Sequence, residues 1–71
     1  MKMCNVIKQI RIDLHLSQMT FADELHVHFS TVNRWENDRA EPNPLATMAL
    51  ISLCEQRNVR KDLVDFLRNL K

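Results

Sequence analysis

Hydrophobic residues recur along this chain three and four positions apart, which is the spacing that lines one face of an α-helix. The clearest stripe lies near the N-terminus and consists of Met3, Ile7, Ile10 and Leu14, with Val6 beside it. Alternation of apolar and polar residues, the sign of a half-buried strand, never lasts more than a few positions. The pattern therefore predicts an all-α fold.

Two short helices are predicted after the first. Ser17 is a good N-cap for a helix over residues 18–25, in which Phe21, Ala22 and Leu25 share a face. After a turn of about three residues, another helix is expected over 29–37. Its tryptophan, the single one in the chain, is expected at the centre of the core.

Two further helices are predicted in the second half of the chain. Asn43 followed by Pro44 is the signal for a helix start. This helix is apolar nearly all round until Glu55, so it is expected to be buried at the centre of a bundle. A last helix over residues 60–70 carries an apolar stripe of Leu63, Phe66, Leu67 and Leu70.

The predicted helix over 29–37 has two different faces. At about 100° per residue, Val32, Trp35 and Glu36 fall on one side. The opposite side holds Phe29, Ser30, Asn33, Arg34 and Asn37, of which all but the phenylalanine can hydrogen-bond to a base edge or a phosphate. Two short helices with a tight turn, the second exposing a polar face, form the outline of a helix-turn-helix.

The stretch "LSQMTFADELHVHFSTVNRWENDRAEPNPLA" closely resembles the Cro/cI-like (XRE) helix-turn-helix family of phage and bacterial repressors. With "IRIDLHL" upstream, the likeness covers roughly residues 5–55. It implies a compact five-helix bundle of the lambda-repressor-like type, forming a single domain over residues 1–71 with the helix-turn-helix at about 17–37. It also implies sequence-specific binding of double-stranded DNA, with repression of transcription as the outcome.

The resemblance assigns a role to individual residues. The positions that it implies for base contact are Phe29, Ser30, Asn33 and Arg34, and those for backbone contact are Gln18, Asn37 and Arg39. Gln18 would either bond a phosphate or brace the recognition helix. Residue chemistry agrees with this sorting, since arginine forks onto guanine O6 and N7 and asparagine onto adenine N6 and N7.

Phe29 is the one apolar residue on the polar face of the predicted recognition helix. An apolar side chain at the mouth of the major groove can pack on a thymine methyl group. The alternatives are that Phe29 folds back onto its own protein or serves a protein interface.

Arg11 and Glu36 occupy positions that, in relatives, join the first helix to the end of the third through a largely buried ion pair. Glu36 falls on the inward side of its helix, where an unpaired carboxylate would be costly. We therefore expect a structural ion pair between these two residues.

The chain departs from the family at the positions where glycine is usual. His26 stands in the turn and Asp38 after the recognition helix, and the whole chain contains no glycine. Both positions are expected to take positive φ, which His, Asn and Asp tolerate at a modest cost. His28 is a weaker N-cap than the usual small polar residue. These departures indicate marginal stability.

Composition argues against several classes of protein. The two cysteines, Cys4 and Cys54, form no CxxC pair and are expected to be buried free thiols in a reducing compartment. His15, His26 and His28 lack a convergent carboxylate or thiol, so no metal site is expected. Nothing in the chain indicates a catalytic residue or a phosphate-binding glycine loop. We expect a protein that is not an enzyme and needs no cofactor.

DNA-binding domains usually carry a clear excess of basic residues. The net charge of +1 and the balanced charges of residues 1–40 therefore weaken the hypothesis of DNA binding without removing it. They predict weak non-specific binding. The alternative from another class is a protein–protein interaction module that has kept the scaffold and lost DNA, such as an antitoxin or an adaptor.

Partners and location can also be anticipated. A homodimer, at least on DNA, is expected because one reading helix offers little specificity. Its interface could be an exposed part of the last helix (Val64, Phe66 and Leu70), although that stripe could instead close the monomer core. A toxin or another regulator is a possible protein partner. No export signal or membrane segment is present, so a cytoplasmic protein of bacterial or phage origin is expected.

Overall fold

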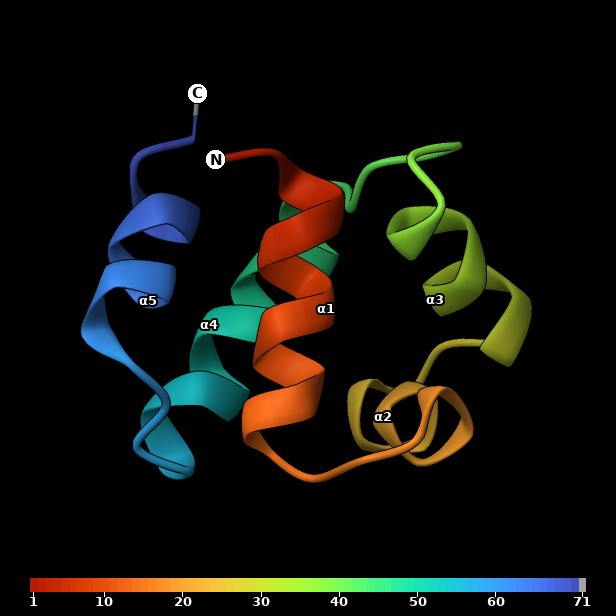
Figure 1. The fold of residues 1–71 in the computed structure, drawn as a ribbon, viewed down its shortest axis with the longest axis horizontal. Coiled ribbons are helices and arrows are strands. Elements are labelled where there is room, and N and C mark those ends of the chain that lie inside the picture. Colours follow the sequence, from red (N-terminus) through yellow and green to blue (C-terminus); the bar gives the residue numbers. More distant parts are fainter. Residues whose placement is uncertain (71) are drawn as a thin grey trace.

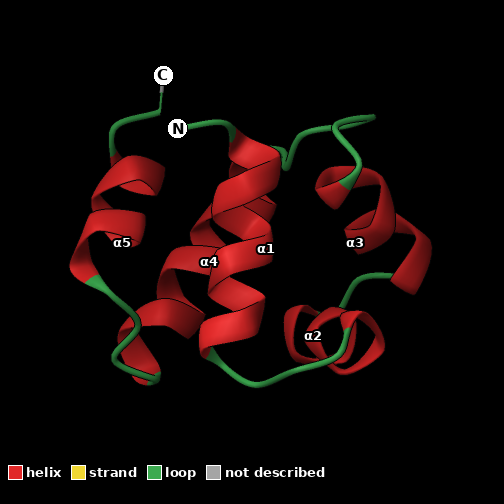
Figure 2. Ribbon diagram, viewed as in Figure 1, coloured by secondary structure: helices red, strands yellow, loops and turns green. Residues whose placement is uncertain are grey.

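The computed structural model describes residues 1–70, and all regular structure within that range is helical (Figures 1 and 2). The elements are α1 (Met3–Asp13), α2 (Gln18–Leu25), α3 (Phe29–Glu36), α4 (Pro44–Gln56) and α5 (Lys61–Arg68). In the view of Figure 1, α1 stands in the middle, with α2 and α3 on one side and α5 on the other. The predicted all-α fold of five helices is confirmed.

All five helices contribute to one hydrophobic core. The largest fully buried side chains are Ile7 and Ile10 from α1, Phe21 from α2, Leu50 from α4, and Leu63 and Leu67 from α5. From α3, Val32 is fully buried and Trp35 nearly so. The stripe predicted for α1 is confirmed except at Leu14, which is only half-buried at the edge of the core.

Two of the helices begin with the caps that the sequence predicts. The hydroxyl oxygen of Ser17 accepts a hydrogen bond from the amide of Thr20 at 3.1 Å. The side-chain oxygen of Asn43 accepts one from the amide of Ala46 at 2.8 Å, with Pro44 in the first turn. Each cap satisfies an amide that has no partner within its own helix. By contrast, α3 starts after His28 with no side-chain cap, as expected for this residue.

Each connection between consecutive helices contains one residue in the left-handed backbone conformation, with φ between 57° and 60°. These residues are His15, His26, Asp38 and Asn58. The amide of the next residue then donates a hydrogen bond of 2.9–3.1 Å to the carbonyl five positions earlier, which closes the end of the preceding helix. Positive φ at His26 and Asp38 was predicted. Positive φ at His15 and Asn58 was not predicted from the sequence.

The prediction that α4 is buried all round is wrong. Leu45 is 76% exposed and Met48 is 67% exposed, and full burial is limited to Leu50, Leu53 and Cys54. The reason is that α4 packs mainly against α2 and α5, and no helix in the described part of the chain covers the side that carries Leu45 and Met48. The apolar composition of α4 therefore does not mean that the helix is buried on all sides.

The last helix differs from the expectation in a related way. Val64, one of the residues offered for a dimer interface, is buried within the monomer core. Phe66 is half-buried, and Leu70 lies beyond the end of α5 and is exposed. Most of the α5 stripe thus closes the monomer, which was the other possibility left open by the sequence.

Both cysteines are free and buried, as predicted. Burial raises the pKa of the Cys54 thiol to about 11, because the charged thiolate would lose its hydration inside the core. The neutral thiol is therefore the dominant form at physiological pH, and it acts as a small apolar side chain. No helix within residues 1–70 is long and apolar enough to cross a membrane.

Two leucines of α4 test this arrangement with the same substitution. Leu50→Ala should lower the free energy of unfolding by about 2–5 kcal/mol, because it leaves a cavity in the core. Leu45→Ala should change the free energy of unfolding by no more than about 0.5 kcal/mol, because the side chain is already in solvent. Urea denaturation of the two variants measures the difference. Equal losses would mean that α4 is covered on all sides after all.

Candidate nucleic-acid interface

The outward face of α3 is the candidate interface. Phe29, Ser30, Arg34 and Asn37 are exposed on it, while Val32, Trp35 and Glu36 point into the protein. Phe29 retains 47% exposure, so its own chain covers about half of it and the rest is open to an outside partner. Arg39, in the loop after α3, is also exposed.

An ion pair between Arg11 of α1 and Glu36 at the end of α3 fixes the position of this face. Nε of Arg11 lies 2.7 Å from Oε2 of Glu36, and Nη2 donates to Oε1 at 3.1 Å. The remaining nitrogen, Nη1, donates to the backbone oxygen of Leu16 at 2.9 Å. Only 2% of the Glu36 side chain is exposed, so the two-point pairing replaces its lost hydration.

Gln18, the first residue of α2, links this ion pair to α3. Its Nε2 donates to Oε1 of Glu36 at 3.1 Å, and its Oε1 accepts from Nδ2 of Asn33 at 3.2 Å. Nδ2 of Asn37 in turn donates to Oδ1 of Asn33 at 3.2 Å and to the Asn33 backbone oxygen at 2.8 Å. Of the two roles expected for Gln18, bracing the recognition helix is the one seen in the free protein.

The same bonds change the picture of Asn33. The sequence places it among the outward residues, but the structure leaves it half-buried between two other amides. The sequence reading missed this arrangement, because only the distance between α2 and α3 decides whether Gln18 reaches it. Arg34, its neighbour, stays fully available on the surface.

Ion pairing decides which of the charged side chains around α3 remain free. Asp38 is paired with Lys2 at 3.1 Å, Glu36 with Arg11, and Glu24 with Arg57. The hydrogen bond and attraction from Asp38 hold the pKa of Lys2 above its ordinary value. Within residues 1–70, neither Arg34 nor Arg39 forms an ion pair, so both charges are open to an outside anion.

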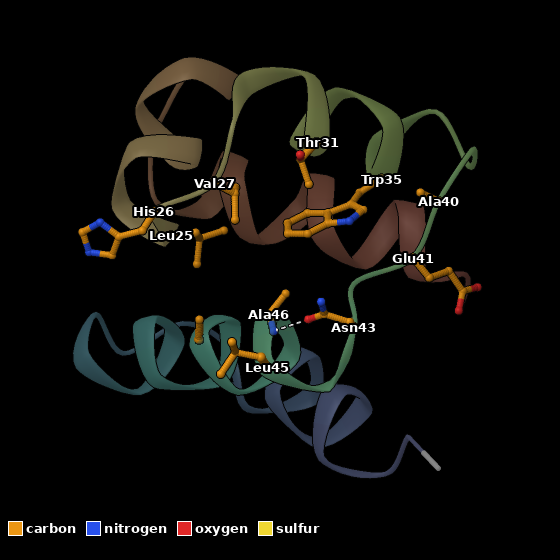
Figure 3. Close-up of a pocket in the computed structure, with 11 residues that line it drawn as sticks. Leu25, His26, Val27, Thr31, Trp35, Ala40, Glu41, Asn43, Leu45 and Ala46 are labelled. Carbon is orange, nitrogen blue, oxygen red and sulfur yellow. Dashed lines mark hydrogen bonds between the residues drawn. The ribbon is translucent and has the colours of Figure 1, made fainter.

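A shallow apolar hollow lies beside the helix-turn-helix (Figure 3). One wall comes from the turn between α2 and α3 and from α3 itself, and the other from the first half of α4. The hollow has a volume of about 460 Å³, and its lining includes Val27, Trp35, Leu45, Ala46 and Ala49. This hollow could not be predicted from the sequence, which indicated a fully covered α4.

Metal chemistry finds no support in the arrangement of side chains. Across residues 1–70, no three His, Cys, Asp or Glu residues are grouped so that they could hold a metal ion. His26 and His28 are exposed on either side of Val27 in the turn, without a third ligand.

Arg11→Ala tests the structural role of the ion pair. The substitution leaves the Glu36 carboxylate buried without a partner, so the free energy of unfolding should fall by about 3–5 kcal/mol. Arg34→Ala is the matched control: it removes an exposed, unpaired guanidinium and should cost no more than about 0.5 kcal/mol. Denaturation curves measure both. If Arg11→Ala keeps wild-type stability and loses only affinity for DNA, Arg11 is a DNA contact and not a structural residue.

Comparison with known proteins agrees with this geometry. A family model described as Helix-turn-helix matches residues 7–53, which cover the later part of α1, all of α2 and α3, and most of α4. No curated protein and no solved structure matches the chain. The matched segment contains the ion pair, the amide network and the whole candidate interface. The chain therefore belongs to the Cro/cI-like (XRE) helix-turn-helix family of DNA-binding regulators.

Proposed function

We propose that this protein is a transcriptional repressor that binds a specific sequence of double-stranded DNA by inserting α3 into the major groove. The observation that carries the proposal is the exposed, unpaired guanidinium of Arg34 on a helix that the buried ion pair holds in place. A rigid helix of this size fits the major groove, where each base pair presents a distinct set of donors and acceptors. Family membership supports the general role of a DNA-binding regulator.

The exposed residues of α3 and of the segment that follows it are expected to make different kinds of contact with DNA. Arg34 would fork onto guanine O6 and N7, which is the commonest specific contact to a base. Phe29 would pack on a thymine methyl group, and Ser30 would bond to whichever base edge it meets. Contacts of Asn37 and Arg39 to phosphates would set the register of α3 without reading the sequence.

Repression needs no more than occupancy of the right duplex. The part of the chain that the structure describes is a helical bundle measuring 26 × 24 × 19 Å. A protein of this size on an operator covers promoter DNA that the polymerase would otherwise contact. If the protein also binds a toxin or another regulator, it would still contact DNA through this same face of α3.

The expected homodimer finds better support on α4 than on α5. Leu45 and Met48 are exposed on α4, and Leu45 also lines the apolar hollow together with Ala46 and Ala49, so this helix offers both exposed apolar side chains and a recess. A twofold contact requires such a self-complementary patch. The chain carries no charged residue from Pro44 to Cys54, as is typical of an interface core. The accessible surface of the protein is 4744 Å². An interface usually takes up about a tenth of a small protein's surface, so the contact area here is small and the dimer should be weak without DNA.

Selection of binding sites from random duplexes, at a stated salt concentration, tests the proposed DNA binding. The wild-type protein should enrich a short motif. Arg34→Ala should weaken binding to that motif by about tenfold or more and blur one position of it, because a bidentate guanine contact is lost. Arg68→Ala, which removes an equal charge from α5 on the far side of the bundle from α3, should do neither (Figure 1). Failure of a folded wild-type protein to enrich any motif would favour the interaction module instead.

Leu45→Asp tests the dimer. The added charge on the α4 face should abolish cooperative binding to a two-half-site operator while leaving the affinity for a single half-site within about twofold, since α3 is untouched. Asn5→Asp adds the same charge on the exposed side of α1 and serves as the control. Gel-shift titrations on one-site and two-site duplexes give both numbers. Unchanged cooperativity in Leu45→Asp would rule out this face.

A further inference from the structure

The hydrogen bonds that run through Gln18 have a direction that is fixed at their inner end. The carboxylate of Glu36 has no hydrogen to donate, so Gln18 must turn its Nε2 toward it, as observed at 3.1 Å. Oε1 of Gln18 then faces the other way and accepts from Nδ2 of Asn33 at 3.2 Å. The charge of Glu36, held in place by Arg11, thus decides which side of the Asn33 amide carries the donor.

The outer end of the same chain of bonds is fixed independently. Nδ2 of Asn37 donates to the backbone oxygen of Asn33 at 2.8 Å, and a carbonyl can only accept. The same Nδ2 donates to Oδ1 of Asn33 at 3.2 Å. If the Asn33 amide turned over, its oxygen would face the oxygen of Gln18 and its NH2 group would face the NH2 group of Asn37. Both contacts would be repulsive, so one orientation is selected.

The fixed amide keeps enough free capacity to read a base. Asn33 uses one of its two N–H groups and one of its two lone pairs, which leaves one donor and one acceptor. Adenine offers N7 as an acceptor and N6 as a donor in the major groove, in an order that reverses when an A·T pair becomes T·A. An amide that cannot turn over therefore distinguishes the two orientations of the pair.

We propose that Gln18 is a positioning residue for sequence recognition: it transmits the acceptor character of Glu36 to Asn33 and so fixes the orientation of one A·T pair in the preferred site. This inference rests on the proposed function, because it concerns the same DNA-binding face. It goes further in naming a specificity determinant that need not touch a base itself. The positioning contact and its consequence for DNA can be measured separately.

The first measurement uses the free protein. Gln18→Met keeps the length of the side chain and removes both hydrogen bonds, so the Asn33 side-chain amide resonances in ¹⁵N NMR spectra should shift and lose their contact to residue 18. Gln9→Met is the matched control, since the Gln9 amide also donates to a carboxylate, that of Asp13 at 2.8 Å, but lies outside this network. Asn33 resonances that respond equally to both substitutions, or to neither, would overturn the proposal.

The second measurement uses a duplex obtained by site selection and its variant with one A·T pair inverted, at the position where Asn33→Ala flattens the base preference. Wild-type protein should discriminate between the two by about tenfold, and Gln18→Met by no more than about twofold. In an Asn33→Ala background, Gln18→Met should cause no further change. Asn37→Ala, at an exposed position, releases the outer end without disturbing the buried ion pair and should weaken the same discrimination.

Three results separate the possible failures. Equal loss of affinity for both duplexes in Gln18→Met, with discrimination intact, would make Gln18 a phosphate contact and overturn the proposal. Additive effects of Gln18→Met and Asn33→Ala on discrimination would overturn it as well. If the wild-type protein binds no duplex, the proposed function itself fails, whatever the NMR spectra of the free protein show.

Discussion

The ion pair between Arg11 and Glu36 is the contact on which the rest of the molecule depends. Burial of Val32 and Trp35 decides which face of α3 turns inward, but the hydrophobic effect is non-directional and does not by itself hold the helix in a single orientation. The two-point pairing does fix it, and a third bond to the Leu16 carbonyl ties in the turn that leads to α2. Because neighbouring residues of a helix are about 100° apart, a rotation of α3 by one residue would take Arg34 off the exposed face.

The sequence could anticipate what depends on local order along the chain. It predicted the five helices, the caps at Ser17 and Asn43, and positive φ at His26 and Asp38. It could not anticipate how many neighbours surround a helix, so the exposure of Leu45 came as a correction. Periodicity states that a residue is apolar and on which face it lies, but the packing of other helices decides whether that face is covered.

The candidate site shows the same division. The family resemblance singled out Gln18, Asn33 and Arg34 from their places in the motif; the first two are hydrogen-bonded to each other, and Arg34 is exposed on the surface. That Gln18 holds Asn33 depends on a distance of 3.2 Å across two helices, which no spacing in the sequence encodes. The net charge is equally uninformative about the site. It counts Glu36 and Asp38 against Arg34, although these two carboxylates are paired with Arg11 and Lys2 and leave Arg34 free.

The four turns without glycine have an energetic consequence. A side chain held at positive φ raises the energy of the native state, although His, Asp and Asn do so only modestly. A chain with no glycine also has a less varied denatured ensemble, so it gives up less backbone entropy when it folds. The two effects oppose each other, and a small bundle can thereby retain strained corners that a glycine-rich chain of the same length would not need.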